Sequence, residues 1–222
     1  SYIHYLARIK PSDASGRLQP VYGIGWESEL VEREISRLAG FKGLGPVRVG
    51  NQAYTHDQHD VYGEMVLAMA PMFFDARLEG DRRAFYQQVV SLVEKAIEVF
   101  EIPDAGIWEM RSEQKHYVFS KVMCWAAVDR GVRIAKKMRD LPRQQKWSSV
   151  LGAMREEIET QGWDETEGCY GQYYGTGMPD ASNLLMTAVN FHPKGHPRIK
   201  QMVESYQKTL LKDGFVFRYL NR

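Results

Sequence analysis

A carboxylate directly follows a tryptophan in the stretch Gly106-Ile107-Trp108-Glu109-Met110-Arg111, and a cation stands two residues further on. A tryptophan beside a carboxyl group can exclude water from it, which raises the pKa of that carboxyl towards the range of a general acid. Loops carry chemistry of this kind when a rigid scaffold positions them. The same six residues also fit an ordinary turn between helices, in which Trp108 fills the core and Glu109 is solvated. Glu109 is therefore a candidate general acid whose support has to come from the surrounding elements.

Two long stretches rich in polar and aromatic residues provide further candidates. Residues 39–57 contain five glycine or proline residues together with Arg48, Asn51, Gln52, Tyr54 and His56. A loop of this length within a domain is usually functional or disordered, and its polar content favours an ordered loop that faces a ligand. Residues 162–177 predict a second loop of the same character. His56 and His59 lack a third converging ligand, so we expect no metal site.

The elements that must position these residues are predicted from apolar spacing. Apolar side chains recur at helical intervals, which predicts helices over residues 29–38, 58–74, 82–101, 116–138, 143–160, 180–190 and 196–212, and a helix end over residues 1–9. Asp81 and Asp180 are expected to cap the helices that follow them, and Pro71 is expected to kink or shorten its helix. The strand signals are weak, and the best of them is residues 214–219.

Burial alternates along this series of helices. Residues 116–138 and 180–190 are apolar around most of the helix, whereas residues 82–101, 143–160 and 196–212 are apolar on one side only. A helix that is apolar on every side is buried on every side, so fully buried helices alternate with half-exposed ones. Two concentric rings of helices produce this alternation. The sequence therefore predicts an all-α chain with little or no β structure that forms part of an α/α toroid, with its long loops at one mouth.

Composition excludes several classes of function. The chain has 222 residues, 44% of them hydrophobic, and a formal net charge of +1, so it can bury a core but offers no basic surface for nucleic acid or an anionic membrane. No apolar run approaches the roughly 20 residues that cross a bilayer, and the first residues lack the layout of a signal peptide. Cys124 and Cys169 have no zinc-binding spacing, and Cys124 is expected to be a buried thiol in a reducing compartment. We therefore expect a cytoplasmic protein without a cofactor.

Several stretches, in this order, resemble the bacterial and archaeal branch of glycoside hydrolase family 15, which contains glucoamylases, glucodextranases and some trehalases. They are Leu18-Gln19-Pro20-Val21-Tyr22, Pro46-Val47-Arg48-Val49-Gly50-Asn51-Gln52-Ala53, Asp60-Val61-Tyr62-Gly63-Glu64, Gly106-Ile107-Trp108-Glu109, Ser120-Lys121-Val122-Met123-Cys124-Trp125, Asp180-Ala181-Ser182 and Phe217-Arg218-Tyr219. Together they span essentially the whole chain. Because their order matches as well as their residues, the resemblance is more specific than any single motif.

The resemblance implies an (α/α)6 toroid that hydrolyses α-glucosidic bonds with inversion. Glu109 would be the general acid, and Trp108 would line the sugar pocket. Arg218 would bind hydroxyl groups of the released glucose, and Arg48 would face the mouth through which the substrate enters. The expected partner is an α-glucoside: an oligosaccharide, a polysaccharide end or trehalose.

The chain also departs from the family pattern. An inverting mechanism needs a second carboxylate ~6.5–9.5 Å from the first, and the family carries it on a segment after the Arg-Tyr match. We therefore expect residues 1–222 to form a single partial catalytic domain, about half of the toroid, without the start and the C-terminal part of the barrel. Such a chain is expected to be inactive by itself and to self-associate through exposed inner-ring surface.

Two other classes of function remain open from the sequence. One is a non-catalytic helical binding or interaction module derived from the toroid. The other is a toroidal sugar isomerase or epimerase, which would use histidines as acid and base. The six histidines are scattered, and none stands beside the Trp108-Glu109 turn in the sequence, which disfavours the isomerase.

Overall fold

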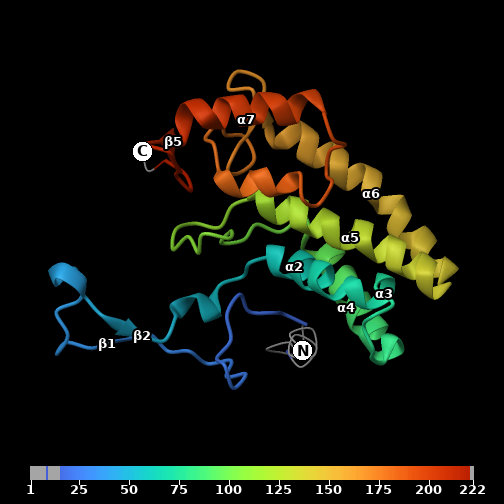
Figure 1. The fold of residues 1–222 in the computed structure, drawn as a ribbon, viewed down its shortest axis with the longest axis horizontal. Helices are drawn as coiled ribbons and strands as arrows, with labels where there is room; N and C mark the ends of the chain where they lie inside the picture. Colours follow the sequence, from blue (N-terminus) through green and yellow to red (C-terminus); the bar gives the residue numbers. More distant parts are fainter. Residues whose placement is uncertain (1–8, 10–15, 221–222) are drawn as a thin grey trace.

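The computed structural model describes residue 9 and residues 16–220. It consists of a body of packed helices from which one irregular segment extends, the arm, which contains residues 29–50 (Figure 1). The helix end expected at residues 1–9 lies outside the described residues, except for Ile9. Within the described part of the chain, no helix combines the length and apolar character that a membrane span requires.

Helix α5 (Val118–Met138) forms the centre of the core. Every residue from Val118 to Val128 is buried, as predicted for a helix that is apolar on all sides. Helix α5 packs on α6 (Leu141–Gln161) on one side and on α2 (Asp60–Met69) and α4 (Arg82–Val99) on the other, and Figure 1 shows it between them. The predicted helix over residues 116–138 is therefore confirmed, and it supports the elements on both sides.

Helices α2 and α5 approach so closely that only glycine fits at one position of their contact. A Cβ atom at Gly63 would lie 2.2 Å from the carbonyl oxygen of Met123, far inside van der Waals contact. The predicted helix over residues 58–74 is divided into α2 and the short α3 (Pro71–Phe74), which begins at Pro71 because proline is tolerated only in the first turn.

The helices on the outside of the stack bury one face each, as predicted. Helix α4 begins at Asp81, whose carboxylate accepts hydrogen bonds from the backbone N–H groups of Arg83 and Ala84. Helix α6 buries Trp147, Met154 and Ile158. Helix α7 (Pro197–Thr209) buries Met202 and Tyr206.

The helix expected over residues 29–38 is wrong. This segment contains the two-residue strand β1 (Arg33–Glu34), which pairs antiparallel with β2 (Arg48–Val49), and the pair belongs to the arm that leaves the helical body. Most side chains of residues 29–38 are exposed, so no buried apolar face stabilises a helix there. The partner strand is distant in sequence, and local periodicity does not reveal it.

The helix expected over residues 180–190, buried on every side, is also wrong. Only the 3-10 helix η3 (Ala181–Met186) forms, and Leu185 is 49% exposed. Asn183 is buried within this short helix, and its Nδ2 donates to the carbonyl oxygens of Gly171 at 2.9 Å and Tyr170 at 3.4 Å. These bonds tie the segment to the 162–177 loop. The apolar side chains had suggested a regular helix, but the polar contacts decide the conformation.

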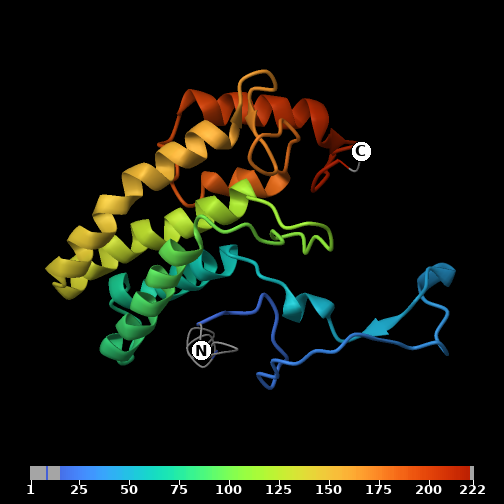
Figure 2. The same ribbon diagram turned by 180° about the vertical axis from the view of Figure 1, so that it is seen from behind.

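Two more short hairpins are the remaining sheets among the described residues, which confirms an all-α chain with little β structure. Strands β3 (Trp163–Asp164) and β4 (Cys169–Tyr170) pair within the 162–177 loop, and β5 (Leu211–Lys212) pairs with β6 (Phe215–Val216) after α7. Figures 1 and 2 show the loop that precedes α5 between the β5–β6 hairpin and the 3-10 helix η2 (Gln52–Thr55). Loops distant in sequence therefore gather at one end of the helical stack.

Candidate active site

The candidate acid lies on a tight turn over residues 106–109. The backbone N–H of Glu109 donates to the carbonyl oxygen of Gly106 at 3.1 Å. Gly106 has φ +66° and faces the ring of Tyr117, which would lie 2.8 Å from any added Cβ atom. Glu109 itself has φ 55°, a left-handed conformation that costs an L-residue roughly 1–2 kcal/mol. Strain of this kind clusters at functional sites, and it marks Glu109 as such a candidate.

A buried polar cluster fixes the start of this turn. Asp104 is completely buried, and its Oδ2 accepts hydrogen bonds from the backbone N–H of His59 at 2.8 Å and from the hydroxyl of Ser120 at 2.7 Å. Burial raises the pKa of Asp104 to about 6, although these hydrogen bonds and the positive charge of Lys121 oppose the shift. Lys121, also fully buried, donates to the carbonyl oxygen of Ile102 at 2.8 Å. The turn is thereby attached to both α2 and α5.

The indole of Trp108 points to a second buried carboxylate. Its Nε1–H donates to both oxygens of Asp180, at 3.0 and 2.9 Å. The aromatic ring of Trp108 also lies 6.2 Å from the ring of Tyr219, measured between centroids. Trp108 is half-buried in this contact, whereas the side chain of Glu109 is exposed. Adjacency to tryptophan therefore does not by itself shield the carboxyl of Glu109 from water, because the indole faces Asp180.

The structure places Arg218 beside Trp108. The guanidinium carbon of Arg218 lies 5.4 Å from the ring centroid of Trp108 and 5.9 Å from that of Tyr219, within the range of a cation–π interaction. Backbone bonds hold this segment against η3, since the N–H of Ala181 donates to the carbonyl oxygen of Arg218 at 2.8 Å. Three predicted site residues, Glu109, Trp108 and Arg218, therefore occur in one region of the structure.

Arg48 occupies a different position, on strand β2 of the arm. Its Nε lies 3.2 Å from Glu32 Oε1 and its Nη2 lies 3.1 Å from Glu34 Oε1. The other oxygen of Glu32 accepts a hydrogen bond from Arg111 at 3.0 Å. Arg48 is thus connected to the turn indirectly. It pairs with Glu32, and Glu32 pairs with Arg111, which stands two residues after Glu109.

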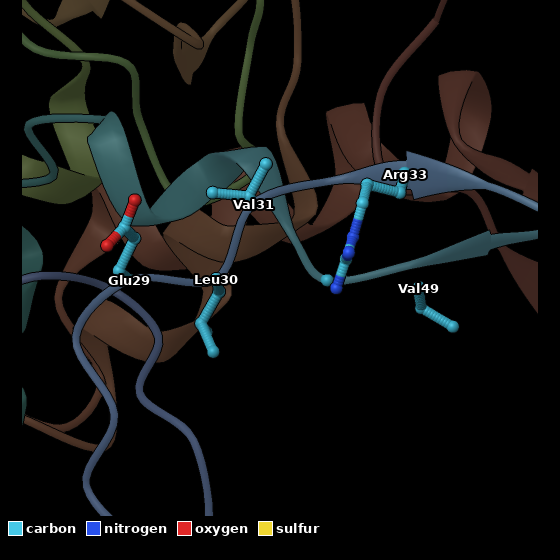
Figure 3. Close-up of a pocket in the computed structure, with 6 residues that line it drawn as sticks. Glu29, Leu30, Val31, Arg33 and Val49 are labelled. Atoms are coloured by element: carbon cyan, nitrogen blue, oxygen red, sulfur yellow. The ribbon is translucent and has the colours of Figure 1, made fainter.

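The arm also carries a hollow of about 500 Å3, whose lining contains none of Trp108, Glu109 and Arg218. Figure 3 shows its lining, which consists of Glu29, Leu30, Val31, Arg33, Val49 and Gly50. Among the residues that the structure describes, no group of three or more histidine, cysteine, aspartate or glutamate side chains could hold a metal ion. The described residues around the turn offer carboxylates, aromatic rings and a guanidinium group.

Comparison with known proteins identifies the family. Residues 3–221 match the family model described as glycosyl hydrolases family 15. The chain belongs to glycosyl hydrolase family 15. Curated relatives include trehalases from Mycolicibacterium smegmatis and Mycobacterium tuberculosis, which are 37% and 36% identical over 98% of this chain, and a trehalase from Thermoplasma volcanium that is 33% identical over 91% of it. The chain spans about a third of the length of these relatives, 32% in each case.

Solved structures show the same fold. A glycosidase in complex with glucose superposes with a TM-score of 0.66 at 17% identity, covering 80% of this chain and 48% of that one. Glucoamylase from Saccharomycopsis fibuligera superposes with a TM-score of 0.56 at 13% identity, covering 69% of this chain and 37% of that one. The chain thus has the fold of part of the (α/α)6 toroid of family 15, as the resemblance implied.

Two residues of the site were not recognised from the sequence. Asp180 was expected only to cap a helix, and it does accept a hydrogen bond from the backbone N–H of Ser182, but it also binds Trp108. Its position in the Asp180-Ala181-Ser182 match was the available signal. Glu32 carried no signal, because its two arginine partners lie in separate segments.

Proposed function

We propose that this chain contributes the general acid and part of the sugar pocket of a glycoside hydrolase site that cleaves α-glucosidic bonds with inversion. In this proposal Glu109 is the general acid, and Trp108 and Arg218 line the pocket for the glucose unit. The observation that carries the proposal is the convergence of the Glu109 turn with Trp108, Arg218 and Tyr219 at the loop end of the helical stack.

Each group has a defined task in the reaction. Glu109 donates its proton to the glycosidic oxygen as the bond from that oxygen to the anomeric carbon breaks. A water molecule adds to the anomeric carbon from the opposite face, and a second carboxylate takes the proton of that water. We assign no residue of this chain to that base. The rings of Trp108 and Tyr219 offer apolar faces to the sugar, and the guanidinium of Arg218 offers hydrogen-bond donors to its hydroxyl groups.

The relatives support trehalose as the first substrate to test. Several proteins that are 25% to 37% identical to this chain over the aligned residues are named trehalases. Because the chain spans about a third of those proteins, the proposal concerns the full-length protein. We also propose that residues 1–222 form one partial catalytic domain, that Arg48 faces the substrate entrance from the arm, and that the separate chain does not turn over the substrate.

The test is glucose release by the full-length protein from trehalose, maltose and isomaltose. Glu109→Gln is expected to reduce kcat by about 10²–10⁴-fold, the usual contribution of a general acid. Glu113→Gln is the matched control, since Glu113 is an exposed glutamate on the same loop, and its kcat is expected to stay within about twofold of the wild type. Equal activity of Glu109→Gln and wild type would refute the assignment.

A substrate with a better leaving group makes the test specific for proton donation. Fluoride leaves α-glucosyl fluoride as an anion, so Glu109→Gln is expected to retain most of its activity on this compound. Proton NMR of the glucose first formed from α-glucosyl fluoride should show the β anomer, because inversion of an α bond gives the β anomer. Sugar binding without any glucose release by the wild-type protein would instead support the non-catalytic binding module.

A further inference from the structure

Asp180 is a buried carboxylate at the junction of the two segments that form the candidate site. We propose that Asp180 is a positioning residue that holds Trp108, and through it the Glu109 turn, against the Arg218-Tyr219 segment. This inference rests on the proposed function, because it concerns the geometry of the same site. It differs from the cap expected from the sequence, which serves only the 3-10 helix η3.

Four donors converge on the carboxylate of Asp180, which is 2% exposed. Besides Trp108 Nε1–H, they are the side-chain amide of Gln172 at 3.0 Å and the backbone N–H and hydroxyl of Ser182 at 2.9 and 2.6 Å. The Trp108 donor is 72 residues away in the sequence. The side chain of Asp180 therefore binds the Trp108 turn, the 162–177 loop and the start of the 3-10 helix η3 that follows Asp180.

The backbone of Asp180 contributes a fourth connection. Asp180 forms an antiparallel bridge with Tyr219, the residue after Arg218. Asp180 thus binds Trp108 through its side chain and the Arg218-Tyr219 segment through its backbone. Displacement of Asp180 would change the spacing between the proton donor and the groups proposed to bind the sugar.

A capping aspartate elsewhere in the chain shows what a cap alone looks like. Asp81 is exposed, and its side chain accepts only from two N–H groups at the start of its own helix, Arg83 and Ala84. Asp180 has the same local bond to Ser182 but adds two donors that a cap does not require. These added bonds are the evidence for a role beyond the helix terminus.

The substitution Asp180→Asn tests this role with minimal change in shape. The amide replaces one acceptor oxygen with an NH2 group, which then faces a donor and leaves it without a partner. Trp108→Phe is the complementary variant, since it keeps an aromatic ring and the carboxylate but removes the indole N–H. If Asp180 acts through the indole, its loss should matter much less once that N–H is absent.

The experiment measures kcat and KM of the full-length protein on trehalose for wild type, Asp180→Asn, Trp108→Phe and the double variant, with Asp81→Asn as the cap control. We expect Asp180→Asn to lower kcat/KM by about 10–100-fold, the scale of a ~1 Å misplacement, and by less than about threefold in the Trp108→Phe background. Asp81→Asn should remain within about twofold of the wild type.

The outcomes separate this inference from the proposed function. Equal losses for Asp180→Asn with and without the indole would overturn the positioning role, as would a loss no larger than that of Asp81→Asn. If Asp180→Asn does not fold, Trp108→Phe decides alone, because kcat within about twofold of the wild type would show that the bond is dispensable. A wild-type protein inactive on every α-glucoside tested would instead refute the proposed function.

Discussion

Replacing Gly63 with alanine is expected to destabilise the protein, although alanine is the better helix former. In an open helix the change gains about 1 kcal/mol. At Gly63 the new methyl group would lie 2.2 Å from the backbone carbonyl oxygen of Met123. A backbone atom has no alternative rotamer, so α2 and α5 must separate by about 1 Å or more, which forfeits close packing along their contact.

The magnitude follows from two opposing terms. Overpacking of a tight core costs about 1–3 kcal/mol and sometimes more, and a rigid backbone neighbour places Gly63 at the upper end of that range. After subtracting the propensity gain, we expect a net loss of about 2 kcal/mol or more. For a domain of this size, that loss corresponds to a Tm decrease of roughly 4–8 °C.

Two other helical glycines provide a graded series of controls. A Cβ at Gly152, on the exposed side of α6, would meet nothing within 4 Å, so Gly152→Ala should stabilise by about 0.5–1 kcal/mol. A Cβ at Gly131 would lie 2.7 Å from Cγ2 of Val93, a side-chain atom that can shift, and an intermediate effect is expected. Thermal unfolding of all three variants is the assay. A Gly63→Ala protein as stable as Gly152→Ala would refute the close helix approach on which the reasoning depends.

Three further predictions concern the core, pH and the arm. Trp147→Ala should cost about 3–5 kcal/mol in urea unfolding, because the indole is fully buried and donates to Glu94. Burial, with a neighbouring histidine and two arginines, lowers the pKa of His192 to about 4. Its contribution to stability is therefore complete above about pH 6.5 and is lost as the pH falls towards 4, so His192→Gln should show a smaller Tm decrease between pH 7 and pH 4 than the wild type. Glu32→Gln should accelerate proteolysis of the arm without changing the Tm of the helical body, because it removes ionic contacts to Arg48 and Arg111; an unchanged cleavage rate would contradict this.

The helices with strong amphipathic or fully apolar patterns could be predicted from the sequence. Helices α4, α5, α6 and α7 were located to within a few residues, because burial of a continuous face determines each of them locally. Residues 29–38 and 180–190 were mispredicted because contacts from other segments decide them. A β partner pairs with Arg33 and Glu34, and the buried amide of Asn183 is bound by the 162–177 loop.

The site was predictable to a similar degree. Glu109 and its neighbour Trp108 form a local motif, and the structure places Arg218, another residue named from the resemblance, beside Trp108. The hydrogen bonds from Trp108 to Asp180 could not be predicted, because they depend on how α5, α6 and η3 bring the two residues together. The left-handed conformation of Glu109 could not be predicted either, because conformational propensities favour positive φ angles chiefly for glycine.

The bond between Trp108 and Asp180 also has a consequence for the order of folding. It closes a loop of 72 residues, and the entropy of closing so long a loop has to be offset before the contact becomes favourable. Helices α5 and α6 lie inside that loop and contact one another directly, so their pairing shortens the distance that remains to be closed. The packed helices can therefore assemble first, whereas the turn over residues 106–109 reaches its final geometry among the last steps. A chain arrested before those steps would have most of its native helical signal in far-UV circular dichroism but would lack the contact between Trp108 and Asp180.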